Sequence, residues 1–356
     1  MDFLLERMTR QGLAQRGAGT AAHVAVTAMG LQAQDAAASR LGVRARSSGV
    51  DEAGVLQASA TEASVVRTWL MRATVHLVAA EDVRWLVALF GPMIERRFAN
   101  VRWRQLGIDQ QVIDKAIPQA REVLAGRQLG RHEFAAELAD RGIRLAEDSQ
   151  AATHLLLALS CRGVTCRGGD RGRDSTFALI EDWVPSAPAP ADPVAELARR
   201  YFRAFGPATA ADFSTWSGLP SGAAITAIRD ELTEVEFDGR RGWTLGAVEP
   251  VPGVRLLPMF DNYLLGYRDR TAMLDPSLHR LVYVGGIIKA TVVCDGRVIG
   301  SWRLEGSARP VRSGRSATVR VAPFQRFTRR HREELERERA DLARFLARTV
   351  DMTIED

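Results

Sequence analysis

The sequence contains few cysteines and lacks any long apolar segment. Its three cysteines, Cys161, Cys166 and Cys294, form no CxxC pair and have no histidines at zinc-binding spacing, so no structural metal site is expected. No apolar run reaches the roughly 18 residues that a membrane span needs. The opening residues MDFLLER carry acids where a signal peptide would carry a basic region. The sequence therefore predicts a cytoplasmic protein with no membrane segment, no bound metal and no cofactor.

Positive charge comes almost entirely from arginine. The chain carries 48 Lys and Arg against 43 Asp and Glu, a formal net charge of +5, and lysine occurs only at Lys115 and Lys289. This excess favours an anionic partner, although it is modest for a DNA-binding protein of 356 residues. The arginine bias is typical of a GC-rich genome as well as of phosphate binding. Charge alone therefore does not identify the partner.

Length and pattern predict an α+β chain of several units. At 356 residues and 46% hydrophobic, with roughly 100 to 200 residues per domain, two to four domains are expected. Helical periodicity followed by strand-like alternation indicates three tandem winged-helix units, each a helix-turn-helix with a β-hairpin wing, and a β-rich C-terminal domain with a terminal helix. The expected parts are residues 1–105, 106–184, a proline-rich linker at 185–193, 194–250 and 251–356.

Several individual elements follow from the same patterns. The first unit is predicted to contain helices at residues 3–16, 20–29, 36–45 and 52–58, a hairpin at 65–70 and 74–78, and a helix from residue 80 that Gly91-Pro92 interrupts. The C-terminal domain is predicted to contain strands at 281–285, 289–294, 298–304 and 318–321 in a small sheet or barrel, and a charged helix at 323–347 with a solvated, ion-paired face.

Two glutamines flank one small apolar residue between two of the predicted helices. Gly30 is predicted to be the left-handed residue that ends one helix, and Asp35 the N-cap of the next. Residues 31–34 would then form a short extended link. Because side chains alternate in direction along an extended chain, Gln32 and Gln34 are predicted to point to the same side.

Such a pair of amides suits a restricted chemistry. Two neutral amides hold a water molecule by donating and accepting hydrogen bonds, but they cannot take its proton as a carboxylate does. Hydrolysis at a sugar carbon normally uses two carboxylates. A substrate whose leaving group is already cationic needs less assistance. The alternative, that the two glutamines are simply solvated, remains open on residue types alone.

Three segments of the chain carry a family resemblance: GLQAQD at residues 30–35, WLMRATVHLV at 69–78 and FDNYLL at 260–265. They resemble the AlkZ-like DNA glycosylases, a family of bacterial winged-helix enzymes. Members of the family carry a Gln-aliphatic-Gln motif, which Gln32, Ala33 and Gln34 match, although Ala33 is smaller than the typical aliphatic residue. A sister branch has Asp at the second polar position. The resemblance extends over nearly the full chain.

The resemblance implies a monofunctional DNA N-glycosylase. It would hydrolyse the N-glycosidic bond of cationic alkylpurines, chiefly N7-alkylguanine, in damaged double-stranded DNA, including bulky natural-product adducts and interstrand crosslinks, in DNA repair or self-resistance. Gln32 and Gln34 would be the catalytic residues and would orient the attacking water. No amine nucleophile is needed, and lysine is too scarce to favour a lyase. We expect the protein to act as a monomer.

Three further residues are candidates to support the reaction. His76 lies among apolar residues of a predicted strand, where a lone histidine is commonly structural, but the resemblance implies a base or a phosphate contact. Asp35 is expected to cap a helix, although a carboxylate beside the amides would also stabilise positive charge on a sugar. Asp261 is the best carboxylate elsewhere in the chain for that role.

The predicted DNA contacts are arginines in two hairpin turns. Arg72 lies in the turn of the first hairpin, and Arg171 and Arg173 lie in the glycine-rich tip at residues 168–174 of the second. A phosphate-cradling nucleotide loop is the rival interpretation of this tip, but the GxxxxGK[ST] order and the following helix are both missing. The tip is therefore interpreted as a wing.

Two functions of other classes remain open. The same winged helices would also suit a non-catalytic, DNA-binding transcriptional regulator in which both glutamines are incidental. A scaffold that binds a protein partner and no longer touches DNA is the third hypothesis.

Overall fold

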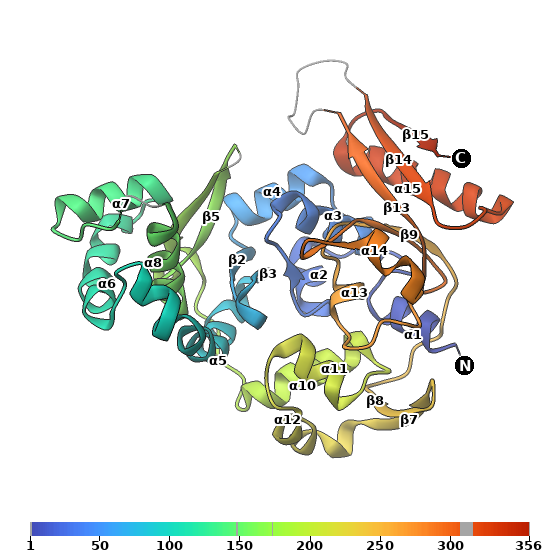
Figure 1. Ribbon diagram of the computed structural model, residues 1–356, viewed down its shortest axis with the longest axis horizontal. Helices are drawn as coiled ribbons and strands as arrows, with labels where there is room; N and C mark the ends of the chain where they lie inside the picture. The colour runs from blue at the N-terminus through green and yellow to red at the C-terminus, as the bar shows by residue number, and fades with distance from the viewer. Residues whose placement is uncertain (1, 147–148, 173, 307–315, 356) are drawn as a thin grey trace. The chain divides into compact units, whose positions relative to one another are not determined.

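The chain folds into two compact units. The computed structural model describes residues 2–146, 149–172, 174–306 and 316–355. Helices and strands both occur throughout these residues (Figure 1), which confirms the expectation of a mixed α and β fold. Unit 1 consists of Met1–Val55 and Ala195–Asp356, and unit 2 consists of Leu56–Val194.

Unit 1 begins with short helices that start at side-chain caps. They are α1 (Phe3–Arg10), α2 (Ala21–Thr27), α3 (Ala36–Arg46) and α4 (Glu52–Ala60), with the strand β1 (Leu31–Gln32) between α2 and α3. Asp2, Thr20 and Asp35 each accept a hydrogen bond from a backbone N–H of the first turn of α1, α2 and α3. The predicted helix at 3–16 is too long, because Gly12 adopts a left-handed φ of 69° just after α1 ends.

Unit 1 continues after residue 194 with a second helical group and a hairpin. These elements are α10 (Pro193–Phe205), α11 (Ala210–Ser217), α12 (Ser221–Ala227), the 3₁₀ turn η3 (Arg229–Glu231), β7 (Thr233–Phe237) and β8 (Arg240–Thr244). The turn between β7 and β8 has positive φ at both Asp238 (51°) and Gly239 (66°), as the Asp-Gly signal predicts for a tight hairpin. Stacked and edge-on aromatic rings fill the interior of this group, among them Tyr201, Phe202, Phe205, Phe213 and Trp216.

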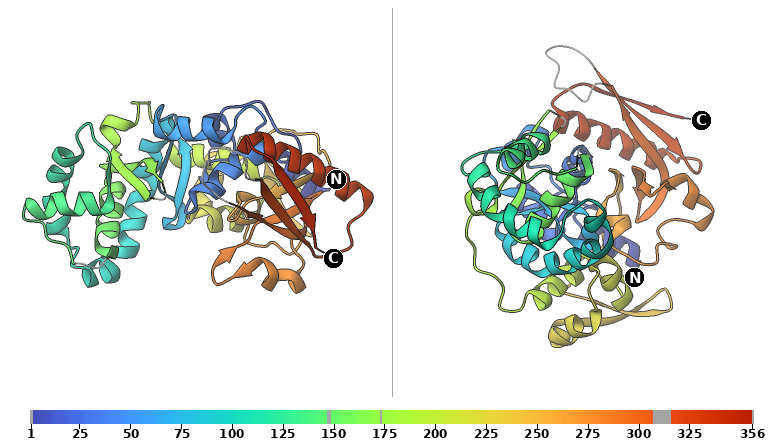
Figure 2. Two further views of the ribbon diagram at one scale, coloured as in Figure 1. Left: turned by 90° about the horizontal axis from the view of Figure 1, so that it is seen from above. Right: turned by 60° about the vertical axis from the view of Figure 1, so that its left-hand side comes forward.

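A five-stranded sheet forms the C-terminal part of unit 1. Its strand order is β15 (Val350–Ile354), β14 (Ala317–Pro323), β13 (Arg297–Glu305), β12 (Thr291–Cys294) and β9 (Val254–Leu257). All neighbours are antiparallel except β14 and β15, which are parallel. Helix α15 (Arg329–Leu346) lies along one face (Figures 1 and 2), and its Leu335 and Leu342 are buried with Val292 and Val319 of the sheet. Of the predicted alternatives, the described strands form an open sheet and not a barrel.

Two C-terminal predictions are wrong in their boundaries. The predicted helix at 323–347 begins only at α15, since Pro323 still belongs to β14 and Thr328 caps the helix. The predicted strand at 281–285 is divided between α14 (His279–Val282) and the two-residue strand β10 (Tyr283–Val284). Strand β10 forms two residue pairs with β11 (Ile287–Ile288), and the turn between them consists of two left-handed glycines, Gly285 and Gly286. The short α13 (Asn262–Leu265) and the 3₁₀ turn η4 (Pro276–Leu278) lie between β9 and α14.

Unit 2 is a small sheet with helices around it. The strand order is β3 (Val75–Ala79), β2 (Val65–Trp69), β5 (Thr165–Arg171), β6 (Asp174–Leu179) and β4 (Leu129–Gly130), with all pairs antiparallel. The 3₁₀ turn η1 (Met71–Ala73) joins β2 to β3, so the predicted first hairpin is confirmed. The helices are α5 (Ala80–Phe98), the π-helical turn η2 (Ala99–Trp103), α6 (Gln110–Leu124), α7 (Arg131–Asp140), α8 (Ser149–Cys161) and α9 (Ile180–Trp183).

Helix α5 runs through Gly91 and Pro92, so the predicted interruption there is wrong. A side chain at Gly91 would lie 2.2 Å from the backbone oxygen of Cys161. The glycine therefore allows α8 to approach closely, and the gain in packing outweighs the lower helix propensity of the Gly-Pro pair.

Candidate active site

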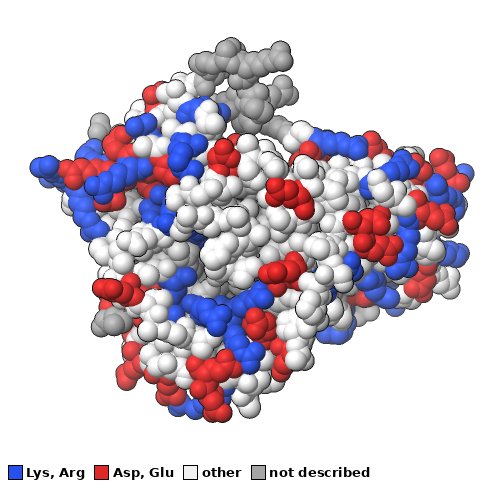
Figure 3. Space-filling view, turned by 180° about the vertical axis from the view of Figure 1, so that it is seen from behind, with Lys and Arg blue, Asp and Glu red and all other residues white. Residues whose placement is uncertain are grey.

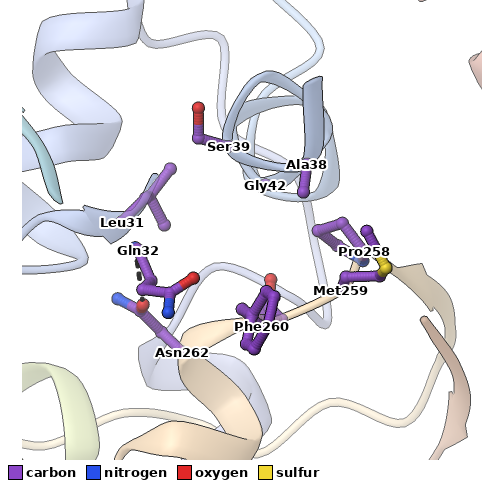
Figure 4. Close-up of a pocket in the computed structure, with 10 residues that line it drawn as sticks. Leu31, Gln32, Ala38, Ser39, Gly42, Pro258, Met259, Phe260 and Asn262 are labelled. Atoms are coloured by element: carbon purple, nitrogen blue, oxygen red, sulfur yellow. Dashed lines mark hydrogen bonds between the residues drawn. The ribbon is translucent and has the colours of Figure 1, made fainter. Parts of the chain in front are cut away.

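A small pocket in unit 1 brings together the glutamine link and the FDNYLL segment, which lie far apart in the sequence. The pocket is shallow, and the empty space of about 160 Å³ between its walls includes open solvent. Its walls come from β1, from α3 and from the segment that runs from the end of β9 to the first residue of α13. The lining residues are Leu31, Gln32, Ala38, Ser39, Gly42, Pro258, Met259, Phe260, Asp261 and Asn262 (Figure 4).

The predicted geometry of the glutamine link is confirmed. Met29 (φ 52°) and Gly30 (φ 79°) are both left-handed, and together they end α2 and turn the chain into β1. The side chains of Gln32 and Gln34 lie on the same side of the link, and Nε2 of Gln32 donates to Oε1 of Gln34 at 2.8 Å. Asp35 accepts a hydrogen bond from the backbone N–H of Ala38 at 2.7 Å, as expected of an N-cap.

The two glutamines differ in burial. Gln32 is only 7% exposed, whereas Gln34 is exposed to solvent. The Gln32 side chain extends from β1 toward Phe260 (Figure 4), and its Oε1 atom is buried without a hydrogen-bond partner among the described residues. A buried acceptor without a partner is costly. It therefore provides a place for the O–H of a water molecule or of a ligand.

Both carboxylate oxygens of Asp261 are bound by an arginine. Its two carboxylate oxygens each accept a hydrogen bond from Arg46 at 2.8 Å, and Oδ1 also accepts from the backbone N–H of Tyr263 at 2.9 Å. Both side chains of the ion pair are 2% exposed. The carboxylate borders the pocket, but its charge is neutralised by the paired guanidinium.

The backbone beside Asp261 is strained. Phe260 has a left-handed φ of 57°, which is unfavourable for a bulky side chain. Such conformations persist where the surrounding structure imposes them, and they cluster at functional sites. Here the strained residue is itself part of the pocket wall.

Two residues of this site were not singled out from the sequence. Asn262 lies inside the FDNYLL segment that carried the family resemblance, so a signal for it was present. Arg46 gave no signal, because it lies 215 positions from its partner Asp261. Pairs this distant in sequence are brought together only by the tertiary fold.

His76 lies in β3 of unit 2 and is buried. Its Nδ1 atom is 3.0 Å from the backbone oxygen of Thr74. Burial, with a smaller contribution from the positive charge of Arg72, lowers the pKa of His76 to about 3, although the Thr74 carbonyl acts in the opposite direction. The imidazole is therefore neutral near pH 7 and is not a general acid there.

The arginines of the two hairpin turns have different surroundings. Arg72 lies in η1 with a left-handed φ of 57° and is half-buried. Arg171 ends β5 and is partly exposed, with Nη1 3.0 Å from Oε2 of Glu133 and Nη2 2.5 Å from the backbone oxygen of Gln128. Arg173 lies outside the described residues.

Charged side chains of both signs are interspersed on the surface shown in Figure 3. This arrangement agrees with the small net charge of +5. Electrostatic attraction to an anionic partner is therefore modest over long range and depends on individual arginines at short range.

Neither a metal cluster nor a membrane helix occurs in the part of the chain that the structure describes. Within it, no three His, Cys, Asp or Glu side chains are grouped as metal ligands, and none of its helices has the length and apolarity of a membrane span.

The three cysteines are free and buried, and burial raises the pKa of Cys161 and of Cys166 to about 12.

Comparison with known proteins identifies the chain as a DNA glycosylase. The family model described as DNA glycosylase AlkZ-like matches residues 27–345, and the chain therefore belongs to the AlkZ-like DNA glycosylase family. It is 30% identical over 367 aligned positions to an interstrand DNA cross-link repair glycosylase of Streptomyces sahachiroi, covering 95% of this chain and 94% of the relative. The solved structure of the Streptomyces sahachiroi DNA glycosylase AlkZ is similar with a TM-score of 0.81 at 28% identity, covering 99% of this chain and 98% of the other.

Proposed function

We propose that this protein is a monofunctional DNA glycosylase that hydrolyses the N-glycosidic bond of cationic N7-alkylguanine and related alkylpurines. The observation that carries the proposal is the paired Gln32 and Gln34 at the pocket, with Oε1 of Gln32 buried and without a partner among the described residues. This acceptor, together with the exposed amide of Gln34, is suited to hold and orient the attacking water.

Few residues of the pocket could act as a general acid or a general base, and this supports a cationic substrate. Of the described residues that line it, only Asp261 carries a carboxylate, and both of its oxygens are bound to Arg46. A neutral base would need a general acid to leave, whereas N7-alkylation makes guanine a good leaving group without protonation. The bond then breaks through an oxocarbenium-like state, which water intercepts.

We extend the proposal to duplex DNA with bulky adducts and interstrand crosslinks, in DNA repair or self-resistance in the cytoplasm. The relative from Streptomyces sahachiroi, whose name refers to cross-link repair, supports this substrate class. Three helix-plus-hairpin groups, with the hairpins β2–β3, β5–β6 and β7–β8, are interpreted as tandem winged helices of a monomer. Arg72, Arg171 and Arg173 are proposed to contact DNA from the turns of the first two hairpins.

The test is excision from duplexes that each contain a single lesion. Incubation with a 7-methylguanine duplex should produce abasic sites much faster than incubation with a uracil or 8-oxoguanine duplex. Equal rates on the neutral lesions would mean that a general acid assists the reaction, and no abasic sites on any duplex would refute glycosylase activity. A duplex crosslinked through N7 of two guanines should be unhooked, as resolved on a denaturing gel. Failure on this substrate alone would restrict the function to monoadducts.

A further inference from the structure

Asn262, the first residue of α13, holds the glutamine link through hydrogen bonds of its side chain. The side-chain amide of Asn262 donates from Nδ2 to the backbone oxygens of Ala28 at 3.1 Å and of Gly30 at 2.5 Å, and its Oδ1 accepts the backbone N–H of Gln32 at 3.4 Å. Asn262 is only 4% exposed. One amide thus satisfies two carbonyls at the end of α2 and one N–H of β1.

The neighbouring residue attaches the same short helix to α3. Asp261 caps α13 through the backbone N–H of Tyr263 and forms the buried bidentate pair with Arg46, the last residue of α3. The link therefore lies between two helices, α2 and α3, that are both bound to the start of α13. Moving the link would require breaking either the Asn262 amide contacts or the buried ion pair.

Holding the link matters because its conformation is an unusual one. Met29 and Gly30 are both left-handed, and Met29 is not a residue that favours this region. Without outside contacts, residues 29–34 would sample other conformations, and the two glutamine amides would lose their common direction. The three hydrogen bonds of Asn262 fall on the segment where the turn passes into β1.

We propose that Asn262 is a positioning residue, anchored by the Asp261–Arg46 pair, which fixes the backbone of the glutamine link so that Gln32 and Gln34 face the reacting water together. This inference rests on the proposed function for its catalytic consequence, but the restraint on the link is testable without activity. Asn262 acts through the backbone of Gln32, whose N–H its side-chain oxygen accepts.

The first experiment measures the restraint directly. Hydrogen–deuterium exchange of a peptide covering residues 29–35 should become faster in Asn262→Ala than in the wild type. Tyr263→Phe is the matched control, because it removes the next buried side-chain hydrogen bond, from the Tyr263 hydroxyl to the Gly296 oxygen at 2.8 Å, without contacting the link. Unchanged exchange in Asn262→Ala, or an equal increase in both variants, would overturn the inference.

The second experiment measures the consequence for catalysis. Single-turnover excision of 7-methylguanine should fall by about 10-fold to 100-fold in Asn262→Ala, with little change in DNA affinity and no change of rate in Tyr263→Phe. In the Gln32→Ala background, adding Asn262→Ala should cost about twofold or less, because the water that Gln32 and Gln34 hold together is already disordered once Gln32 is removed. Effects that multiply fully would mean that Asn262 acts independently of Gln32 and would overturn the inference.

Failure of the proposed function and failure of the variant to fold can each be distinguished from failure of this inference. If the wild-type enzyme does not excise 7-methylguanine, the proposed function fails while the exchange result still decides the restraint. If Asn262→Ala does not fold, the nearly isosteric Asn262→Asp replaces it. That variant keeps the acceptor for Gln32 but places a carboxylate against the two carbonyl oxygens, so faster exchange at residues 29–35 is again expected.

Discussion

Nε2 of Gln32 lies 2.8 Å from Oε1 of Gln34, and this hydrogen bond joins a buried amide to an exposed one. The pair therefore has one member that lines the pocket and one that is exposed to solvent. A water molecule at this position would be bound by both side chains at once. Loss of either amide should disorder it.

Alanine substitution of either glutamine should abolish most of the activity. Gln32→Ala or Gln34→Ala is expected to slow single-turnover excision by about 100-fold to 10,000-fold, the usual range for a group that positions or activates the reacting water. Affinity for DNA should barely change. The double variant should cost much less than the product of the single effects, since the first removal already disorders the water. Full activity in both single variants with unchanged melting curves would move catalysis away from the link.

Carboxylates at the two positions should behave differently. Gln34→Glu keeps the oxygen that accepts the Gln32 hydrogen bond, and its charge remains in solvent, so partial activity is expected. Gln32→Glu would place a charge at a site with 7% exposure, which disfavours the ionised form and should lower both the rate and the melting temperature. Equal activity of the two variants would contradict the assignment of Gln32 as the buried member.

The rate of 7-methylguanine excision should be level between about pH 5 and pH 8. The cationic base needs no proton, the glutamines do not titrate, and burial lowers the pKa of His76 to about 3, well below this range. The measurement is a single-turnover pH profile of the wild type and of His76→Gln. An inflection near pH 6.5 that disappears in His76→Gln would show that the histidine exchanges a proton during the reaction.

Glu338 should be essential for stability although it does not line the pocket. The residue is 1% exposed and forms ion pairs with Arg16, Arg44 and Arg255. Glu338→Gln leaves buried guanidinium groups without a full counter-charge and should lower the free energy of unfolding by about 3–5 kcal/mol. Denaturant unfolding tests this expectation. Glu336→Gln is the control, because its side chain is 56% exposed and its pair with Arg339 should contribute little.

The acid sensitivity of the fold should also depend on Glu338. Burial by itself would raise the pKa of this carboxyl, but Arg44, Arg16 and Arg255 together lower the pKa of Glu338 to about 2, below its ordinary value of 4.5. The folded pKa is below the unfolded one, so the stabilisation is present above about pH 4.5 and is lost as the pH falls toward 2. Melting curves in this window should fall less steeply with pH for Glu338→Gln than for the wild type. Parallel pH dependences would contradict the assignment.

The tip between β5 and β6 should contribute to the salt dependence of DNA binding. Joint replacement of Arg171 and Arg173 by alanine should make the log–log slope shallower by about 0.9 for each phosphate that is no longer neutralised, while excision from bound DNA stays intact. A companion variant, Glu133→Gln, removes the charge that pairs with Arg171 and should strengthen binding at low salt. An unchanged slope in the arginine variant would remove this tip from the DNA interface.

Local patterns in the sequence were sufficient for the glutamine link and for most helices. Gly30 and Asp35 define the ends of the link through their backbone and capping preferences, and alternation along an extended chain puts Gln32 and Gln34 on one side. The Asp238-Gly239 turn follows from the same local rules. These features depend on residues a few positions apart, so no knowledge of the fold was needed.

Tertiary packing decided what local patterns left open. Helix α5 continues through Gly91-Pro92 because α8 packs against the bare glycine, and Glu338, in a helix expected to have a solvated face, is buried by arginines from three distant segments. Arg46 reaches Asp261 across 215 positions, and this contact neutralises a carboxylate that the sequence alone left free. In each case a contact that exists only in the folded chain overrides a local sequence preference. Such contacts prevail because burial strengthens electrostatic interactions and packing.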